Sequence, residues 1–281
     1  MTLPFLSIPT GFSLGAIFSW GTSDFLGGYA ARRANAFVLT TVAHASGLLL
    51  MIALALANHS AYPSRSGVAW ALAAGLSGGA ALAIFYRALA AGKMGLTAPV
   101  AAVLGAAIPT AFNIATDGPP GIVPTAGFVL AGIGILLISR TEDNTRADGL
   151  GLAVLAGIGF AGFFLCIRQA GTDSALWISA ASRLGSLVLT GVIVLLGRNI
   201  RDISGSGVCF GVLAGCLDTG GSALFVRASQ TGRLDTAVVL VSLYPAVTVL
   251  LARLLLKEHF TRWKALGMVA ALLAVPMIAW Q

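Results

Sequence analysis

Four ionisable side chains lie inside long apolar segments of this sequence. Asp24 lies in the second half of the first apolar run, and Asp218 lies near the middle of the eighth. Arg183 and His44 lie inside the seventh and the second run. An ionisable group at membrane depth is costly and is usually functional. These four residues are therefore the first candidates for a site.

The charges of these residues suit the recognition of a small charged molecule. Arg183 would receive a carboxylate and Asp218 an ammonium group, since both would form charge-assisted hydrogen bonds. Asp24, Asp218 or His44 would carry a proton if transport is coupled to one, and histidine titrates near neutral pH. Trp20 and Tyr244, together with Phe85 and Phe225, would cover the apolar part of the transported molecule.

Each of these residues also has a structural interpretation. Asp218 could be bonded to a neighbouring hydroxyl or paired with an arginine for packing, and Asp24 could cap its helix. Arg183 could extend to the interface, while His44 could be a neutral imidazole bonded between helices. The aromatic residues could equally face lipid or pack between helices.

The composition excludes several classes of protein. Of 281 residues, 57% are apolar and 10% charged, and the mean hydropathy is +0.92. Soluble domains carry about 25% charged residues. The net charge is +7, but the basic residues lie singly or in pairs between apolar runs, which indicates membrane topology and no nucleic-acid partner. Cys166, Cys209 and Cys216 lack metal-ligand spacing, so we expect no metal and no cofactor.

Ten apolar runs are long enough to be considered as membrane-crossing helices, which need about 20 residues. They cover Gly11–Ala31, Phe37–Ala57, Gly67–Ala91, Leu96–Ala115, Pro124–Ser139, Gly149–Ala170, Ala175–Gly197, Ser206–Ala228, Asp235–Leu256 and Arg262–Trp280. Only helices satisfy the backbone of such segments without a closed barrel. The sequence therefore predicts an all-α integral membrane protein with ten transmembrane helices.

The two halves of the chain are related by an internal duplication. Gly67–Gly92 aligns with Gly207–Gly232 at an offset of 140 residues, with nine identities in 26 positions, where about three would arise by chance. Residues 1–140 and 149–281 are thus predicted as two five-helix repeats joined by a polar linker, 141–148. Because five is odd, the second repeat enters the membrane inverted, and such repeats place a binding site at the midplane.

The sequence resembles the EamA-type repeat of the drug/metabolite transporter superfamily. The resemblance rests on Phe85-Tyr86-Arg87-Ala88-Leu89, Leu243-Tyr244-Pro245-Ala246-Val247-Thr248, Trp20-Gly21, Glu258 and Gly267. It implies a ten-helix transporter, usually an exporter of amino acids or other small metabolites. The second helix of this repeat often carries an arginine. Arg183 matches that position, whereas the first repeat has His44 there.

A serine hydrolase is the main alternative from another class. Gly75-Leu76-Ser77-Gly78-Gly79 matches both the GxSxG and the GxSG patterns. A nucleophilic Ser77 needs a base within hydrogen-bond reach, and His44 is the sole histidine inside an apolar run. The pattern also belongs to a small-residue stripe, Ala71, Gly75 and Gly79, which favours close helix packing. A membrane assembly subunit without transport is a further alternative.

Basic residues also bear on topology. We expect four arginines near helix ends to extend to the lipid headgroups: Arg87, Arg168, Arg227 and Arg253. The loops on one side of the membrane carry ten basic residues: Arg32, Arg33, Lys93, Arg140, Arg146, Arg198, Arg201, Lys257, Arg262 and Lys264. The loops on the other side carry three: Arg65, Arg168 and Arg233. The charge rule places both termini outside the cytoplasm, whereas the resemblance implies both inside. We follow the charge count.

The sequence thus predicts an exporter of a small polar or zwitterionic metabolite, such as an amino acid. Alternating access would operate at a midplane cavity, with the bilayer and a small molecule as partners and protons as candidate coupling ions. The predicted location is the bacterial inner membrane, with multiple passes.

Overall fold

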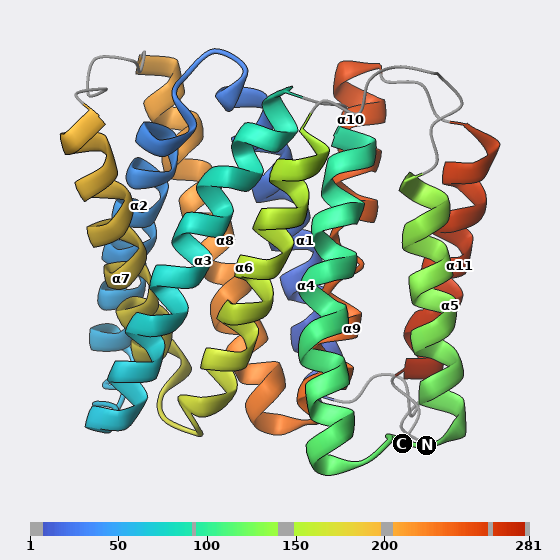
Figure 1. Cartoon of the computed structure of the whole chain (residues 1–281). Coiled ribbons are helices and arrows are strands. Elements are labelled where there is room, and N and C mark those ends of the chain that lie inside the picture. Colours follow the sequence, from blue (N-terminus) through green and yellow to red (C-terminus); the bar gives the residue numbers. More distant parts are fainter. Residues whose placement is uncertain (1–7, 92–93, 140–148, 198–204, 258–260, 279–281) are drawn as a thin grey trace.

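The described residues of the computed structural model, 8–91, 94–139, 149–197, 205–257 and 261–278, form eleven helices and no strand. In chain order they are α1 (Ile8–Ala31), α2 (Ala36–Ala57), α3 (Arg65–Ala91), α4 (Met94–Asp117), α5 (Ile122–Ser139), α6 (Leu150–Gln169), α7 (Ala175–Gly197), α8 (Gly205–Thr231), α9 (Leu234–Val241), α10 (Tyr244–Leu256) and α11 (Arg262–Ile278). Figure 1 shows the helices side by side, running between two opposite faces of the bundle. The all-helical prediction is confirmed.

Seven segments among the described residues are long and apolar enough to cross a membrane. They are α2, α3, α4, α6, α7, α8 and the continuous segment Leu234–Leu256, which contains α9 and α10. Helices α5 and α11 are apolar but shorter, and α1 is rich in Gly, Ser and Thr. The prediction of many apolar spans is therefore confirmed for seven of the ten runs by length and composition.

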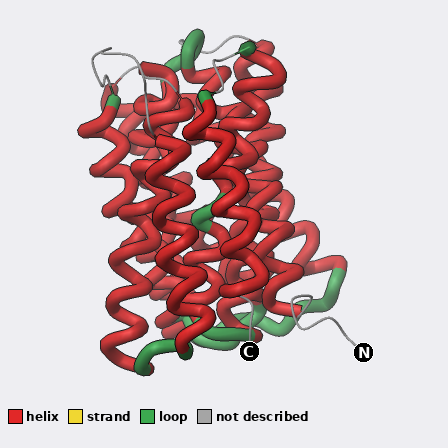
Figure 2. Tube along the Cα trace, turned by 90° about the vertical axis from the view of Figure 1, so that its right-hand side faces the viewer, coloured by secondary structure: helices red, strands yellow, loops and turns green. Residues whose placement is uncertain are grey.

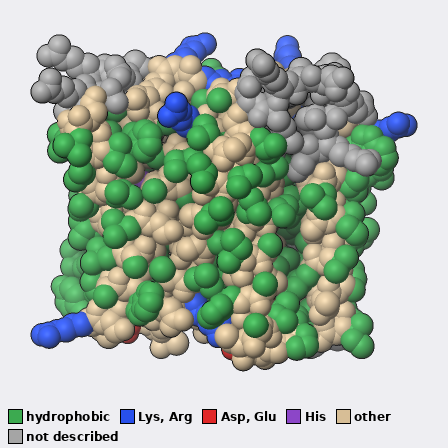
Figure 3. All heavy atoms as spheres, viewed as in Figure 1, with side chains coloured by type: hydrophobic (Ala, Val, Ile, Leu, Met, Phe, Trp, Pro, Cys, Tyr) green, Lys and Arg blue, Asp and Glu red, His purple; other side chains and the backbone are tan. Residues whose placement is uncertain are grey.

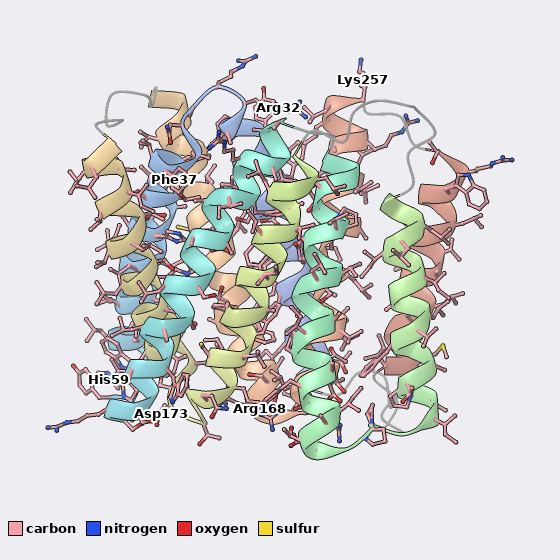
Figure 4. The ribbon with its side chains drawn as sticks, viewed as in Figure 1. Arg32, Phe37, His59, Arg168, Asp173 and Lys257 are labelled. Atoms are coloured by element: carbon pink, nitrogen blue, oxygen red, sulfur yellow. The ribbon has the colours of Figure 1, made fainter. Side chains whose placement is uncertain are left out.

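The outer surface has the polarity of a membrane protein. On the face seen in Figure 3, hydrophobic side chains cover the middle of the bundle, and Lys and Arg lie toward its two ends. Figure 4 places Arg32 and Lys257 at one end and Arg168 and Asp173 at the other. The separation of Arg32 and Lys257 from Arg168 agrees with the alternating loops expected from the sequence.

The predicted run Asp235–Leu256 is divided into two helices. Helix α9 ends at Val241 and α10 begins at Tyr244, and Figure 2 shows a short loop at mid-height of the bundle. Pro245 lies in the first turn of α10 and has no N–H to donate to the preceding turn. The break within this run therefore lies beside the proline, where a helical hydrogen bond is missing, and Leu234–Leu256 remains one candidate span.

Small residues allow the two halves to approach closely. A Cβ atom at Gly75 of α3 would collide with the Ser182 carbonyl of α7, and one at Gly215 of α8 would collide with the Ala43 carbonyl of α2. Ser186 donates a hydrogen bond to the Gly75 carbonyl at 2.8 Å. The predicted small-residue stripes therefore lie at helix–helix contacts, as expected in lipid.

Some sequence predictions fall outside the described residues. They concern Glu258, the linker 141–148, and the basic residues Lys93, Arg140, Arg146, Arg198 and Arg201.

The close contact of α3 with α7 predicts a position-specific effect of adding one methyl group. Gly75→Ala should lower the free energy of unfolding by about 1–3 kcal/mol, because overpacking forces the helices apart. Gly191→Ala, on α7, is the matched control: nothing lies within 4 Å of its added Cβ, and alanine has the higher helix propensity. The measurement is the unfolding temperature of both variants in detergent. Equal unfolding temperatures would contradict the close approach.

Candidate functional site

A cavity lies in the interior of the bundle, between helices of the two halves. It is lined from the first half by α1, α3 and α4 and from the second by α6, α7, α8 and the junction of α9 and α10. Its charged lining residues are Asp24, Arg183 and Asp218. Asp24 lies 159 positions before Arg183 and 194 before Asp218 in the sequence, so the fold brings together three of the predicted site residues.

Two of the charged lining residues form an ion pair between α7 and α8. Arg183 Nη1 lies 2.5 Å from Asp218 Oδ2, and both residues are almost fully buried. The second terminal nitrogen, Nη2, donates to Ser222 Oγ, which in turn donates to the Asp218 carbonyl at 3.0 Å. A buried charge needs such partners because it has lost its water. The guanidinium is therefore held by one carboxylate and one hydroxyl.

His44 completes the surroundings of this arginine from α2. Arg183 Nη1 lies 3.4 Å from His44 Nδ1. Arginine only donates hydrogen bonds, so Nδ1 is the acceptor and lacks a proton in this contact. The geometry supports the neutral, interhelical interpretation of His44. Its predicted role as a proton carrier stays a prediction.

Asp24 approaches the cavity from α1. Its side chain is 5% exposed, and it lies within electrostatic range of Asp218 and of the Tyr244 phenol. Within the described ranges it forms no ion pair. Asp24 is therefore a buried carboxyl at the cavity wall and does not cap the end of its helix.

The predicted aromatic residues lie together beside these charges. Trp20 and Tyr244 line the cavity, with ring centroids 6.4 Å apart in an edge-to-face arrangement. Trp20 Nε1 also donates to the Asp218 carbonyl at 2.9 Å, which fixes α1 against α8. Phe225 packs on Trp20 at 5.7 Å and Phe85 on Tyr244 at 6.5 Å, so both phenylalanines support the wall from behind.

Several lining residues were missed by sequence reasoning as members of the site. Phe163 and Phe164 of α6 line the cavity, and Phe164 lies 6.0 Å from Trp20. Phenylalanines in an apolar run carry no signal that separates lining from packing. Ser222 is different, because it lies one helical turn after Asp218. That spacing on one face indicates a polar pair.

Four arginines are expected at the headgroups, and one of them also pairs with a carboxylate. Arg87, Arg227 and Arg253 are exposed. Arg168 lies at the end of the bundle, where its Nη2 contacts both carboxylate oxygens of Asp117, at the end of α4, at 2.9 Å. This pair joins α4 to α6 at the end of the bundle shown in Figure 4.

Ser77 is used for packing between helices. Its hydroxyl donates to the Gly159 carbonyl of α6 at 2.8 Å, and a Cβ at Gly162 would collide with the same hydroxyl. The hydroxyl is thus engaged where α3 and α6 meet. This contact supports the packing interpretation over the nucleophile.

Two substitutions separate these interpretations of Ser77. Ser77→Ala keeps the small size and should leave transport nearly unchanged. Ser77→Leu should reduce it, because overpacking costs about 1–3 kcal/mol at a tight contact. Uptake into proteoliposomes measures both effects, and a fluorophosphonate probe tests for a reactive serine. Labelling of Ser77 together with an inactive Ser77→Ala variant would support the hydrolase instead.

The comparisons with known proteins agree with this architecture. Residues 148–280 match the EamA-like transporter family. No curated protein sequence matches this chain. Solved structures resemble it, and one, described only as a protein crystal structure, has a TM-score of 0.74 and 16% identity over 96% of this chain and 95% of the other. That likeness shows the fold alone. Residues 148–280 thus match the EamA-like transporter family of the drug/metabolite transporter superfamily, and a match to this family implies a multi-pass membrane protein for transport.

Proposed function

We propose that this protein exports a small polar or zwitterionic metabolite, such as an amino acid, by alternating access. The observation that carries the proposal is the buried, charged cavity whose walls come from both halves of the chain. A membrane protein without transport has no need of an ion pair and a third carboxyl inside its core. A transporter needs such groups, because substrate sites lie near the midplane between repeats.

The packing of the helices supports two inverted repeats, 1–140 and 149–281. Contacts between the halves come in matched pairs: α1 packs on α8 as α6 packs on α3, and α2 packs on α8 as α7 packs on α3. The equivalent helices α2 and α7 contact each other, as do α5 and α11. This pattern is what a two-fold relation between five-helix units produces, when α9 and α10 together count as one span.

The cavity also indicates how a substrate would be held. In this state Arg183 and Asp218 bind each other. For the predicted roles, a zwitterion would have to replace each partner, with its carboxylate on Arg183 and its ammonium on Asp218. Asp24 would then share the site or carry a coupling proton. Trp20 and Tyr244 would cover the apolar part.

The proposed orientation follows from the charged ends of the bundle. Arg32 and Lys257 lie at one end, and both belong to the set of loops in which the sequence places most basic residues. The charge rule assigns that end to the cytoplasm. We place the protein in a bacterial inner membrane on this basis.

A first experiment tests whether the cavity is reached from water. Ser242→Cys and Ser186→Cys place thiols on the cavity wall, in a background with the three native cysteines replaced. Both should react with a charged, membrane-impermeant thiol reagent, and the side of access should change with substrate. Ser179→Cys is the matched control, because Ser179 is buried on the same helix as Ser186 but lies outside the cavity. Complete protection of both cavity thiols from both sides would exclude alternating access here.

A second experiment asks whether the ion pair acts in transport or only in folding. Asp218→Asn and Arg183→Gln should each abolish uptake, and each leaves a buried charge unpaired, which costs about 3–5 kcal/mol. The double variant Arg183→Met/Asp218→Leu removes both charges and should recover stability but not transport. Unfolding temperature and proteoliposome uptake are the two measurements. Wild-type uptake by the double variant would mean that the pair is purely structural.

A further inference from the structure

The charges around the cavity do not balance. Asp24, Arg183 and Asp218 are its charged lining residues, and Arg183 is bound to Asp218. Asp24 accepts no hydrogen bond from the residues that the structure describes and is 5% exposed. An isolated buried carboxylate is costly unless a cation or a proton neutralises it. Asp24 is therefore the charged lining residue to which a cation, or a proton in its absence, would bind.

Arg183 is not free to receive a carboxylate in this arrangement. Its Nη1 contacts Asp218 and His44, and its Nη2 donates to Ser222. Its Nε is buried and has no hydrogen-bond partner among the described residues. A substrate carboxylate would have to displace Asp218, and the displaced carboxylate would then lie near Asp24 as a second uncompensated negative charge. A substrate with a carboxylate is thus disfavoured at this site.

The surroundings of Asp24 suit the body of an organic cation. Trp20 lies one helical turn before Asp24 on α1, and Tyr244 approaches from the start of α10. Aromatic rings attract cations through their faces. The Tyr244 hydroxyl has no hydrogen-bond partner among the described residues, so it is available as an acceptor for an N–H group.

We propose that Asp24 receives the protonated amine of the transported molecule, and that this molecule is an organic monocation without a carboxylate. The proposal rests on the proposed transport function, but it replaces the zwitterion considered above with an amine that carries no carboxylate. It also separates the two carboxyls: Asp218 neutralises Arg183, while Asp24 is left for the substrate.

The test compares ligands that differ by one carboxylate. The probes are 3-methylbutylamine against leucine and 2-phenylethylamine against phenylalanine, with 3-methylbutanol as the uncharged control. Binding to the full chain in lipid nanodiscs is measured by calorimetry. The amines should bind at least about tenfold more tightly than the matching amino acids and the alcohol. The reason is that a hydrogen bond between an ammonium group and the Asp24 carboxylate is stronger than one between neutral groups.

Variants then assign the effect to Asp24. Asp24→Asn should weaken amine binding by about tenfold to a hundredfold, and Asp24→Glu should restore most of it. Asp117→Asn is the matched control, because Asp117 is a carboxylate at the end of α4, outside the cavity, and should leave amine binding unchanged. If Asp24→Asn does not fold, the comparison of ligands on the wild-type protein still decides the proposal.

Three outcomes would overturn the inference. They are amino acids binding more tightly than the matching amines, amines binding equally to the wild type and to Asp24→Asn, and no binding of any amine. None of these results removes the proposed transport function, which is tested separately by the cavity thiols. Conversely, protected thiols with tight, Asp24-dependent amine binding would identify an amine-binding membrane protein that does not alternate.

Discussion

The buried contact between Arg183 and Asp218 is the interaction on which the rest of the interior depends. Neither charge could remain inside the bundle alone, because desolvation of one ion costs several kcal/mol. Together they fix α7 against α8 and hold the Ser222 hydroxyl between them. Trp20 then docks α1 onto the Asp218 carbonyl. One ion pair thus positions three helices from both halves around a single cavity.

Close backbone contact makes this arrangement possible. Side chains as short as serine cannot join helices unless the axes approach, and the glycines at the crossings allow this. Gly75 permits Ser186 to bond to its carbonyl, and Ser23 bonds to the Ala214 carbonyl at 2.8 Å. Without a hydrophobic force between helices in lipid, such contacts and dense packing provide the association. The close helix contacts therefore also hold the polar side chains of the site in place.

Much of this could be predicted from the sequence, and the reasons differ by feature. The helices follow from long apolar runs, and close packing of α3 against another helix follows from small residues spaced four apart. The charged residues were found because charges are rare in such runs. Their partners were not found: nothing in the sequence distinguishes Arg168, which binds Asp117, from an arginine that extends to lipid. Partner choice depends on tertiary distance, which periodicity does not contain.

The charged residues of the cavity are not repeated at the corresponding positions of the two proposed repeats. At the repeat offsets, Arg183 corresponds to His44, Asp218 to Gly78, and Asp24 to Gly162. Gly162 cannot accept a side chain, because a Cβ there would collide with the Ser77 hydroxyl. Each carboxyl therefore corresponds to a glycine in the other repeat: Gly162 lies at a helix–helix contact, and Gly78 lines the cavity. A substrate held by these groups has a single orientation relative to the two repeats, so exchange of their conformations would move access across the membrane while the binding contacts stay on the same helices.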